Sequence, residues 1–381
     1  MNIALINLPL SSNYGANLQR FALYRTLTKL GNKVTYIPLS CRDNIYPKGL
    51  KGFFVYSKRL IKKYIFGHKT VDVLSERKKA KDNAIQMPQI IRFNEEYLNI
   101  WDKVYNNFTG MEELNSKGFD AFVVGSDQIW RFGSDIEHYF LDFVDDNKIK
   151  IAYAASFGNA GEDYSDYAIK RCSKLLNSFQ AVSFREYVGF DIFYRFNWKC
   201  QLDPKWVLDP TLLLEADDYR GVYSKYSNSE KEGIFYYILD INNEKLELLQ
   251  QVSTAIHLKK YGITTLFPNI GKGTKITIPS IEQWLRYIDE SKFVVTDSFH
   301  GTMFSIIFNK PFLSIINNER GNQRYYPLME KLGLGDRLIS EDNLKSFSFN
   351  HLHKIDWELV NKKLQSLRAD SINFLKSSLI R

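Results

Sequence analysis

The sequence predicts an α/β protein with two Rossmann-like, doubly wound domains that face each other across a cleft. Short apolar runs typical of buried strands alternate with segments of helical spacing along most of the chain. This alternation occurs in two successive blocks, and 381 residues are too many for one ordinary core but suit two α/β domains. We therefore expect a first domain at residues 1–207, a second at 208–355 and a C-terminal helix at 356–381.

The first block opens with a strand at residues 3–8, and a polar turn separates this strand from a helix at 17–29. A Gly-Asn pair ends that helix, and residues 33–38 have the composition of a second strand. This order predicts a Rossmann-like unit, although the GxGxxG fingerprint of dinucleotide-binding proteins is absent from its turn. Three further strands are expected, one at 119–124, one in the stretch 150–158 that ends in a turn, and one at 181–184 that is followed by the charged pair Arg185–Glu186.

The second block repeats the alternation after Pro210, which ends an extended stretch. Its expected strands lie at 233–239, 263–267, 293–296 and 311–316, and its expected helices at 244–257, 281–288 and 303–308. Helical spacing of apolar residues returns from Asp356 to the C-terminus. Strands that alternate with helices in this way predict a parallel sheet with helices on both faces in each block.

The net charge of +8 is concentrated in a basic insertion at residues 48–81, which carries eleven Lys or Arg and two acidic residues. Aromatic and aliphatic residues alternate there with pairs of basic residues, a pattern that suits peripheral contact with an anionic membrane. A solvated basic helix or a loop between elements explains the pattern equally well. We expect no nucleic acid partner, because no nucleic-acid-binding motif accompanies the insertion.

The chain contains no run of 18 apolar residues, and it opens directly on a strand without the charged region of a secretory signal. We therefore expect a cytoplasmic protein, with peripheral contact at the inner face of the membrane as the alternative that the basic insertion suggests. Its three cysteines are far apart and lack CxxC spacing. This argues against a disulfide framework and a structural zinc site, and we expect no metal.

Polar residues and glycines follow the predicted strands, at the positions where open α/β sheets bind ligands. These segments are Asn13–Gly15, Gly125–Gln128, Ser156–Gly158, Arg185–Glu186 and Asp297–Gly301. Gly15 allows close approach of the backbone to a ligand, although a plain tight turn also explains it. The recurrence of such residues at five strand ends predicts one site at the carboxyl edges of the sheets.

His300 is the sharpest candidate in these segments, because it lies between a buried strand and a helix. The amides at a helix N-terminus attract an anion, and an imidazole there can contact phosphate or act as a general acid or base. The alternative is a histidine that caps the helix or packs beneath the loop.

Three further charged residues are candidates with a structural alternative. Arg185 can form two hydrogen bonds to a carboxylate or phosphate, or it can form an internal ion pair with Glu186 or another acid. Asp127 can orient or deprotonate a sugar hydroxyl, but an Asp after Gly-Ser is also a common turn or cap residue. Arg324 lies in a late polar stretch that either binds an anion or forms a solvated surface loop.

Six short stretches together resemble the polysaccharide pyruvyl transferase family. They are NYGANLQ from Asn13, FVVGSDQIW from Phe122, YAASFG from Tyr153, VSFRE from Val182, LDPTLL from Leu208 and TDSFHGT from Thr296. Each is short, but their order and spacing make the resemblance specific, and it extends over most of the chain. Members of this family are similar to GT-B glycosyltransferases in architecture, which implies two Rossmann-like domains across a cleft.

The resemblance implies transfer of pyruvate from phosphoenolpyruvate to two sugar hydroxyls as a cyclic ketal, without a cofactor. The resemblance implies that His300 and Arg185 bind the phosphate and the carboxylate of the donor. Many members have Arg directly before that histidine, where this chain has Phe299, and we expect Arg324 to substitute. The partners implied are phosphoenolpyruvate and a sugar acceptor. If the basic insertion contacts a membrane, we expect this acceptor to be linked to a lipid.

The strand-end residues and the resemblance together give a set of expected site residues. The expected catalytic residues are His300, Asp127 and Arg185. The expected donor-binding residues are Arg185, His300, Ser298, Gly301 and Arg324. The expected acceptor-binding residues are Asn13, Tyr14, Gly15, Ser126, Asp127 and Trp130. Two alternatives stay open, namely a GT-B glycosyltransferase that uses a nucleotide sugar and a non-catalytic carbohydrate-binding protein of polysaccharide assembly.

Overall fold

The computed structural model describes residues 1–40, 57, 58, 60, 75–133, 136–158, 163–225, 232–264, 278–316, 322–349 and 352–380. Most of the basic insertion at 48–81 lies outside these residues, as does the end of the strand expected at 263–267. Among the described helices, none is long and apolar enough to cross a bilayer.

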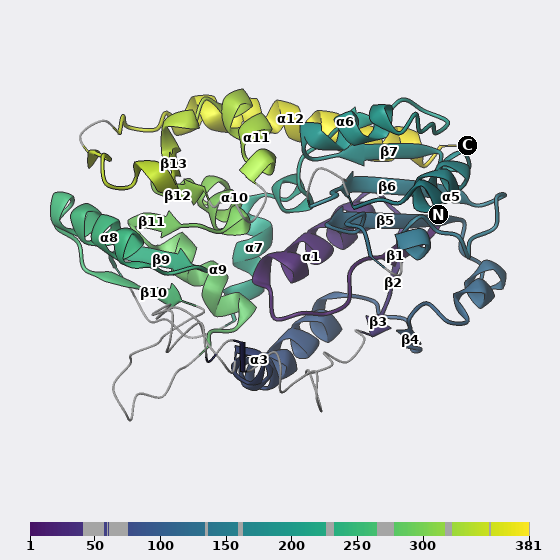
Figure 1. Ribbon diagram of the computed structural model, residues 1–381, viewed down its shortest axis with the longest axis horizontal. Helices are drawn as coiled ribbons and strands as arrows, with labels where there is room; N and C mark the ends of the chain where they lie inside the picture. Colours follow the sequence, from purple (N-terminus) through teal and green to yellow (C-terminus); the bar gives the residue numbers. More distant parts are fainter. Residues whose placement is uncertain are drawn as a thin grey trace.

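Six parallel strands form the first sheet, in the order β2-β1-β5-β6-β7-β8 (Figure 1). Its strands are β1 (Asn2–Ile6), β2 (Lys33–Ile37), β5 (Ala121–Asp127), β6 (Ile149–Ala155), β7 (Ala181–Phe184) and β8 (Lys205–Trp206). The helical segments in this part are α1 (Tyr14–Lys29), α3 (Ser75–Tyr97), η1 (Met111–Ser116), α4 (Ile136–Tyr139), α5 (Asp166–Leu176) and α6 (Tyr187–Arg195). The short strands β3 (Leu39–Ser40) and β4 (Tyr105–Asn106) pair separately.

Five parallel strands form the second sheet, in the order β10-β9-β11-β12-β13. They are β9 (Ile234–Ile238), β10 (Lys260–Thr264), β11 (Phe293–Thr296), β12 (Phe312–Ile316) and β13 (Leu338–Ser340). The longer helices after the first sheet are α7 (Ala216–Tyr223), α8 (Asn243–Ala255), α9 (Ile281–Glu290), α10 (Phe299–Ile307), α11 (Tyr326–Leu332) and α12 (Trp357–Ser378). The shorter ones are η2 (Pro210–Leu213), η4 (Asn322–Arg324), η5 (Gly335–Arg337) and η6 (Glu341–Asn343).

Alternate residues of a strand face different cores, because successive side chains point to opposite faces of a sheet. Ile3 and Leu5 of β1 belong to a cluster that also contains Val294 of the second sheet. Ala4 and Ile6 belong to a second cluster, on the opposite face of the first sheet. A third cluster covers the other face of the second sheet. The first cluster is therefore a continuous apolar core that packs the two halves of the molecule together.

The two halves are also joined by polar contacts and by the C-terminal helix. The Tyr14 hydroxyl donates to the carbonyl oxygen of Pro279 at 2.6 Å, and Arg92 Nη2 donates to Glu282 Oε1 at 2.6 Å. Helix α12 runs along both halves and ends beside the first sheet (Figure 1). There Ser371 Oγ accepts a hydrogen bond from the amide of Leu208 at 3.0 Å. These contacts fix the position of the second sheet relative to the first.

The predicted α/β class with two parallel sheets is confirmed, but two helices begin earlier than the apolar spacing predicted. Helix α1 begins at Tyr14 instead of residue 17, because the side chain of Asn13 accepts from the amide of Ala16 and caps it. Helix α10 begins at Phe299 instead of residue 303, because Ser298 Oγ caps it. Candidate site residues expected in loops, including His300, therefore lie in the first turns of helices.

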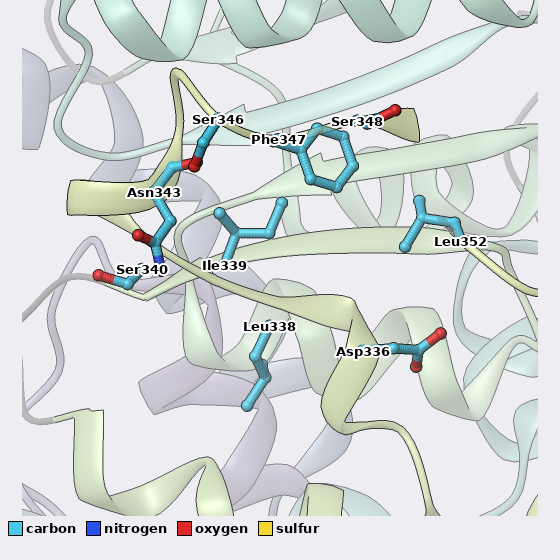
Figure 2. A pocket seen from close by; sticks show the side chains of 9 residues that line it. All are labelled: Asp336, Leu338, Ile339, Ser340, Asn343, Ser346, Phe347, Ser348 and Leu352. Carbon is cyan, nitrogen blue, oxygen red and sulfur yellow. The ribbon is translucent and has the colours of Figure 1, made fainter. Parts of the chain in front are cut away.

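A surface pocket of about 420 Å³ lies beside the edge strand β13 (Figure 2). Its lining combines serine and asparagine side chains with apolar ones such as Ile339, Phe347 and Leu352. None of the residues expected to form the functional site lines this pocket. The candidate site is therefore built from contacts elsewhere in the molecule.

Candidate active site

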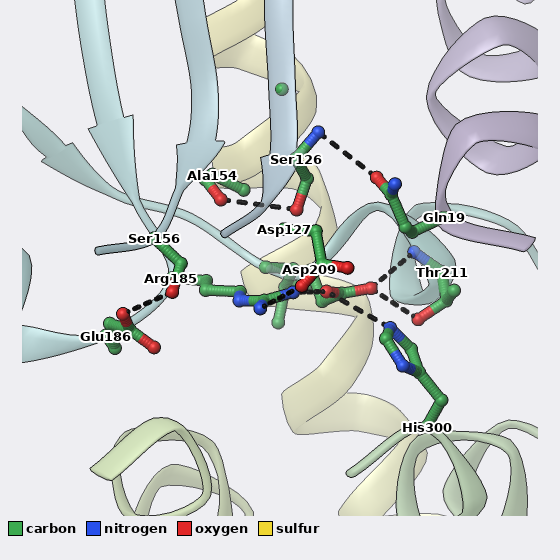
Figure 3. A network of polar contacts seen from close by, with 12 residues as sticks. Gln19, Ser126, Asp127, Ala154, Ser156, Arg185, Glu186, Asp209, Thr211 and His300 are labelled. Carbon is green, nitrogen blue, oxygen red and sulfur yellow. Dashed lines mark hydrogen bonds and ion pairs between the residues drawn. The ribbon is translucent and has the colours of Figure 1, made fainter. Parts of the chain in front are cut away.

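Residues from both sheets converge on one cluster of charged side chains (Figure 3). Asp127 is the last residue of β5, and Arg185 directly follows β7 in the same sheet. His300 comes from the second sheet, in the first turn of α10 after β11. Asp209, at the N-terminus of η2 between the two sheets, connects them. The three residues expected to be catalytic are thus brought together, with a fourth that was not expected.

Arg185 binds two carboxylates with its two terminal nitrogens. Its Nη1 donates to Asp209 Oδ2 at 2.6 Å, and its Nη2 donates to Asp127 Oδ1 at 3.0 Å. The side chains of Arg185 and Asp209 are each only 1% exposed. The internal ion pair considered as the alternative for Arg185 is present, with these acids as partners instead of Glu186. Only Nε remains without a hydrogen-bond partner among the described residues.

His300 is held between the two halves of the molecule and is itself buried. Its Nε2 lies 3.7 Å from Asp209 Oδ2, which is an ion-pair distance but too long for a hydrogen bond. On the opposite side, the ring lies against Gly15 of α1, where an added Cβ would be 1.9 Å from Nδ1. The absence of a side chain at Gly15 is therefore what lets the imidazole occupy this position.

Two guanidinium groups contact the Phe299 ring at the site. The Arg185 guanidinium carbon lies 5.2 Å from the ring centroid, and that of Arg324 lies 4.9 Å from it. The His300 ring contacts the same phenyl ring edge-on at 5.2 Å between centroids. Cations are attracted to an aromatic face at these distances. Arg324 thus lies in the neighbourhood where it was expected to substitute for an arginine at position 299.

Three buried nitrogens around Phe299 have no hydrogen-bond partner within the described part of the chain. They are Arg185 Nε, His300 Nε2 and Arg324 Nε. Buried polar atoms in folded proteins are nearly always hydrogen-bonded, so a group of such atoms calls for an explanation. Nitrogens of two guanidinium groups and an imidazole, next to the N-terminus of α10, suit an anionic ligand.

The charges of the cluster shift one another's pKa values. Burial by itself raises the pKa of Asp127, but the charges of Arg185 and His300 outweigh it and hold that pKa below its ordinary value. The same balance holds for Asp209, where His300 and Arg185 lower the pKa. Burial lowers the pKa of Arg185, but the two aspartates raise it above the ordinary value. Both aspartates are therefore ionised near neutral pH.

The backbone around Asp127 is held by buried polar contacts. The amide of Ser126 donates to Gln19 Oε1 at 3.1 Å, and Ser126 Oγ donates to the carbonyl of Ala154 at 3.2 Å. Asp127 itself has a φ of 69°, in the left-handed region that Asp tolerates better than most residues. Because the Ser126 side chain is fully buried and engaged, it supports Asp127 instead of offering a hydroxyl to a ligand.

Two residues expected to bind the acceptor have side chains in apolar cores. Tyr14 stacks on Trp284 at 5.4 Å between centroids, and its hydroxyl is bound to Pro279, so it packs the two halves together. Trp130 is fully buried, stacks on Phe140 at 4.5 Å and donates from Nε1 to the carbonyl of Tyr139. We correct both assignments, because neither side chain is available to a ligand in this structure.

Three other expected residues shape the ends of helices. Asn13 and Ser298 are the N-caps of α1 and α10, and their side-chain oxygens accept backbone hydrogen bonds. Gly301 lies so close to β11 that an added Cβ would be 2.5 Å from Thr296 Oγ1. These residues orient the first turns that carry Gly15 and His300. Their own amides donate within the protein, that of Asn13 to Ser11 Oγ, that of Ser298 to Thr296 Oγ1 and that of Gly301 to Ser298 Oγ.

The sequence analysis assigned no site role to two acidic residues near the cluster, Asp209 and Glu186. Asp209 was not assigned a role, although it follows a strand and precedes Pro210, as a strand-end site residue would. Glu186 is buried and accepts a hydrogen bond from Ser156 Oγ at 2.7 Å. Both belong to stretches that carry the family resemblance. A reading of all acidic residues that follow strands would have found them.

No group of three or more His, Cys, Asp or Glu side chains suited to a metal ion occurs among the residues described. The two cysteines that the structure describes, Cys172 and Cys200, are both unpaired thiols. Burial raises the pKa of each thiol to about 12, so neither is a thiolate near neutral pH. The chemistry of the cluster is therefore that of carboxylates, guanidinium groups and an imidazole.

Comparisons with known proteins identify a family and a fold. The model of the polysaccharide pyruvyl transferase family matches residues 13–319, which is most of the chain. No curated protein matches the sequence significantly. The structure of S. aureus MnaA with UDP is similar, with a TM-score of 0.52 and 11% identity over 99% of this chain and 96% of that one.

A UDP-GlcNAc 2-epimerase from Methanocaldococcus jannaschii is also similar, with a TM-score of 0.49 and 12% identity over 96% of this chain and 92% of that one. At such low identities a structural likeness shows the fold alone. That fold is GT-B, as the two parallel sheets and the returning C-terminal helix also indicate.

Proposed function

The chain belongs to the polysaccharide pyruvyl transferase family, and from this premise we propose that it transfers pyruvate from phosphoenolpyruvate to a sugar. The product is a cyclic ketal that bridges two hydroxyls of a polysaccharide or its precursor. The observation that carries the proposal is the group of three buried nitrogens of Arg185, His300 and Arg324 that have no hydrogen-bond partner among the described residues. Phosphoenolpyruvate carries a phosphate and a carboxylate, and both accept charge-assisted hydrogen bonds from such donors.

Arg185 and Arg324 have different parts in donor binding. Both terminal nitrogens of Arg185 already donate to aspartates, whereas its Nε has no hydrogen-bond partner among the described residues, so we assign Nε to the donor. The guanidinium of Arg324 contacts the same Phe299 ring as that of Arg185 and supplies a second cation. We assign the phosphate to His300 and the N-terminus of α10, and the carboxylate to the arginines. This charge complement stabilises the departing phosphate without a metal or cofactor.

The proposed reaction proceeds in two additions at C2 of phosphoenolpyruvate. His300 protonates C3, which becomes the methyl group and leaves C2 electrophilic. One sugar hydroxyl adds to C2 and loses its proton, and the C2–O bond to phosphate breaks. The second hydroxyl then adds to C2, loses its proton and closes the ketal. Asp127, which is ionised and borders the cluster, accepts the hydrogen bond from the attacking hydroxyl and is the proposed base.

We propose a lipid-linked sugar as the acceptor and a cytoplasmic enzyme at the inner face of the membrane. This rests on the excess of Lys and Arg at residues 48–81, because cations near an anionic bilayer bind its surface. Gly15 of the acceptor set lies in the first turn of α1 against the His300 ring, and Asn13 caps that turn. The amides of that turn are therefore the proposed contacts for the sugar.

The experiment that tests this function is acceptor-dependent release of phosphate from phosphoenolpyruvate. Purified protein is incubated with phosphoenolpyruvate and a panel of glycosides, either free in water or lipid-linked in anionic vesicles. We expect phosphate release with a matching acceptor and a pyruvyl ketal in the product by mass spectrometry. Transfer of a sugar from a nucleotide sugar, with release of the nucleotide and no use of phosphoenolpyruvate, would instead show a glycosyltransferase, which shares the fold. Sugar binding with no turnover of either donor would show a carbohydrate-binding protein.

Replacing Arg324 with alanine is expected to raise KM for phosphoenolpyruvate by about 10- to 100-fold, as loss of one charge-assisted hydrogen bond implies. The turnover number should fall less, because Arg324 binds the donor and transfers no proton. Steady-state kinetics over a range of phosphoenolpyruvate concentrations measures both. Arg25→Ala is the control, since it removes the same charge from an exposed position on α1. An unchanged KM in R324A would remove Arg324 from the donor site.

A further inference from the structure

We infer that Asp209 is a positioning residue, which holds His300 and Arg185 in one arrangement across the two halves of the molecule. The inference rests on the proposed function and extends it to a residue without an assigned role. Arg185 belongs to the first sheet and His300 to the second, and a single oxygen of Asp209 faces both. The segment between the sheets thus places the carboxylate that joins their charged groups.

The contacts of Asp209 fix the orientation of its carboxylate. Oδ2 accepts from Arg185 Nη1 at 2.6 Å and lies 3.7 Å from His300 Nε2. Oδ1 accepts from the amide of Thr211 at 3.0 Å and from Thr211 Oγ1 at 2.7 Å. Rotation of the carboxylate would break the Thr211 bonds. One oxygen is therefore anchored in the chain, and the other is presented to the two cations.

Burial and charge argue that Asp209 acts through its neighbours and does not itself contact the substrate. Its side chain is 1% exposed, and both oxygens are already engaged by protein groups. Arg185 and His300 carry like charges when the imidazole is protonated, and the carboxylate between them offsets their repulsion. Without it, Asp127 would be the one acidic hydrogen-bond partner left to Arg185 in the described part of the chain.

This arrangement predicts an unusual kinetic signature for Asp209→Asn. Loss of a buried negative charge makes the site more cationic, so phosphoenolpyruvate should bind at least as tightly as to the wild type. Turnover should nevertheless fall by about 10- to 100-fold, because an amide has a single accepting oxygen and cannot accept from Thr211 and from Arg185 together as the carboxylate does. A residue that only supports the fold would weaken stability, binding and turnover together.

The test compares wild type, Asp209→Asn, Thr211→Val and Asp289→Asn. Thr211→Val removes the hydroxyl bond to Oδ1 of Asp209 but keeps the carboxylate. It should lower turnover by a smaller factor than Asp209→Asn does. This variant still tests the inference if Asp209→Asn folds poorly. Asp289 is the matched control, because it accepts two hydrogen bonds from Arg220 away from the cluster. Asp289→Asn should leave turnover unchanged. Binding of phosphoenolpyruvate, turnover and thermal unfolding are measured for each variant.

A second readout is independent of turnover, so it separates this inference from the proposed function. Diethylpyrocarbonate acylates unprotonated imidazoles, and peptide mass spectrometry reports the rate at His300, with exposed His257 as internal reference. In Asp209→Asn, His300 should react several-fold faster relative to His257, because the imidazole loses its charge-assisted contact with Asp209. An unchanged His300 rate, or weaker donor binding together with lost turnover, would overturn the inference. If the wild-type protein neither bound nor turned over phosphoenolpyruvate, the proposed function would be wrong. The acylation rates of His300 in the wild type and in Asp209→Asn would still test the role of Asp209.

Discussion

Replacing His300 with alanine is expected to reduce acceptor-dependent phosphate release by about 100- to 10,000-fold, the usual effect of removing a general acid. The imidazole is the group of the cluster best suited to carry a proton to C3 of the donor near neutral pH. It lies in the first turn of α10, among two guanidinium groups and two aspartates. The assay for phosphate release described above measures the loss directly.

His257→Ala is the control for this variant, because it removes an exposed imidazole from the second half of the chain. It should release phosphate at the wild-type rate. The thermal unfolding of His300→Ala is compared with that of the wild type, so that a folded but inactive protein is recognised. A folded His300→Ala variant with wild-type turnover would contradict the assignment of the acid to His300, whatever donor the enzyme uses.

The elements of this fold followed from the sequence where apolar runs and turns were clear. Residues 33–38 and 293–296 read as strands because β-branched and aromatic residues form short buried runs, and both are strands in the structure. The starts of α1 and α10 were missed because the first turns carry polar or glycine residues. Apolar spacing cannot indicate such turns, whereas the caps Asn13 and Ser298 do.

The candidate site could be predicted only in part, for a related reason. Strand ends in a parallel sheet lie at one edge, so Asp127 and Arg185 were expected to be neighbours from their place in the sequence. The pairing of Arg185 with Asp209, and the contact of His300 with Gly15, depend on how the two sheets are packed together. That packing is set by the core between the sheets, in which Tyr14 takes part.

Replacing Gly15 with alanine is expected to lower turnover by about 100-fold or more, the lower range for loss of a positioned general acid, while the protein stays folded. The added Cβ would lie 1.9 Å from Nδ1 and 2.3 Å from Cγ of His300, which is far inside van der Waals contact. The imidazole must therefore turn away from Asp209 and from the donor. Alanine favours a helix over glycine, so the free energy of unfolding should not fall in proportion to activity.

Gly221→Ala separates the effect on His300 from the general effect of alanine in a helix. Gly221 lies in α7, and an added Cβ there meets nothing within 4 Å. This control should be as stable as the wild type or more stable, by up to about 1 kcal/mol, with unchanged turnover. Turnover and urea unfolding are measured on both variants. If Gly15→Ala kept wild-type turnover, the contact between α1 and the imidazole would have no part in catalysis. The two halves of the molecule would then meet at this point for stability alone.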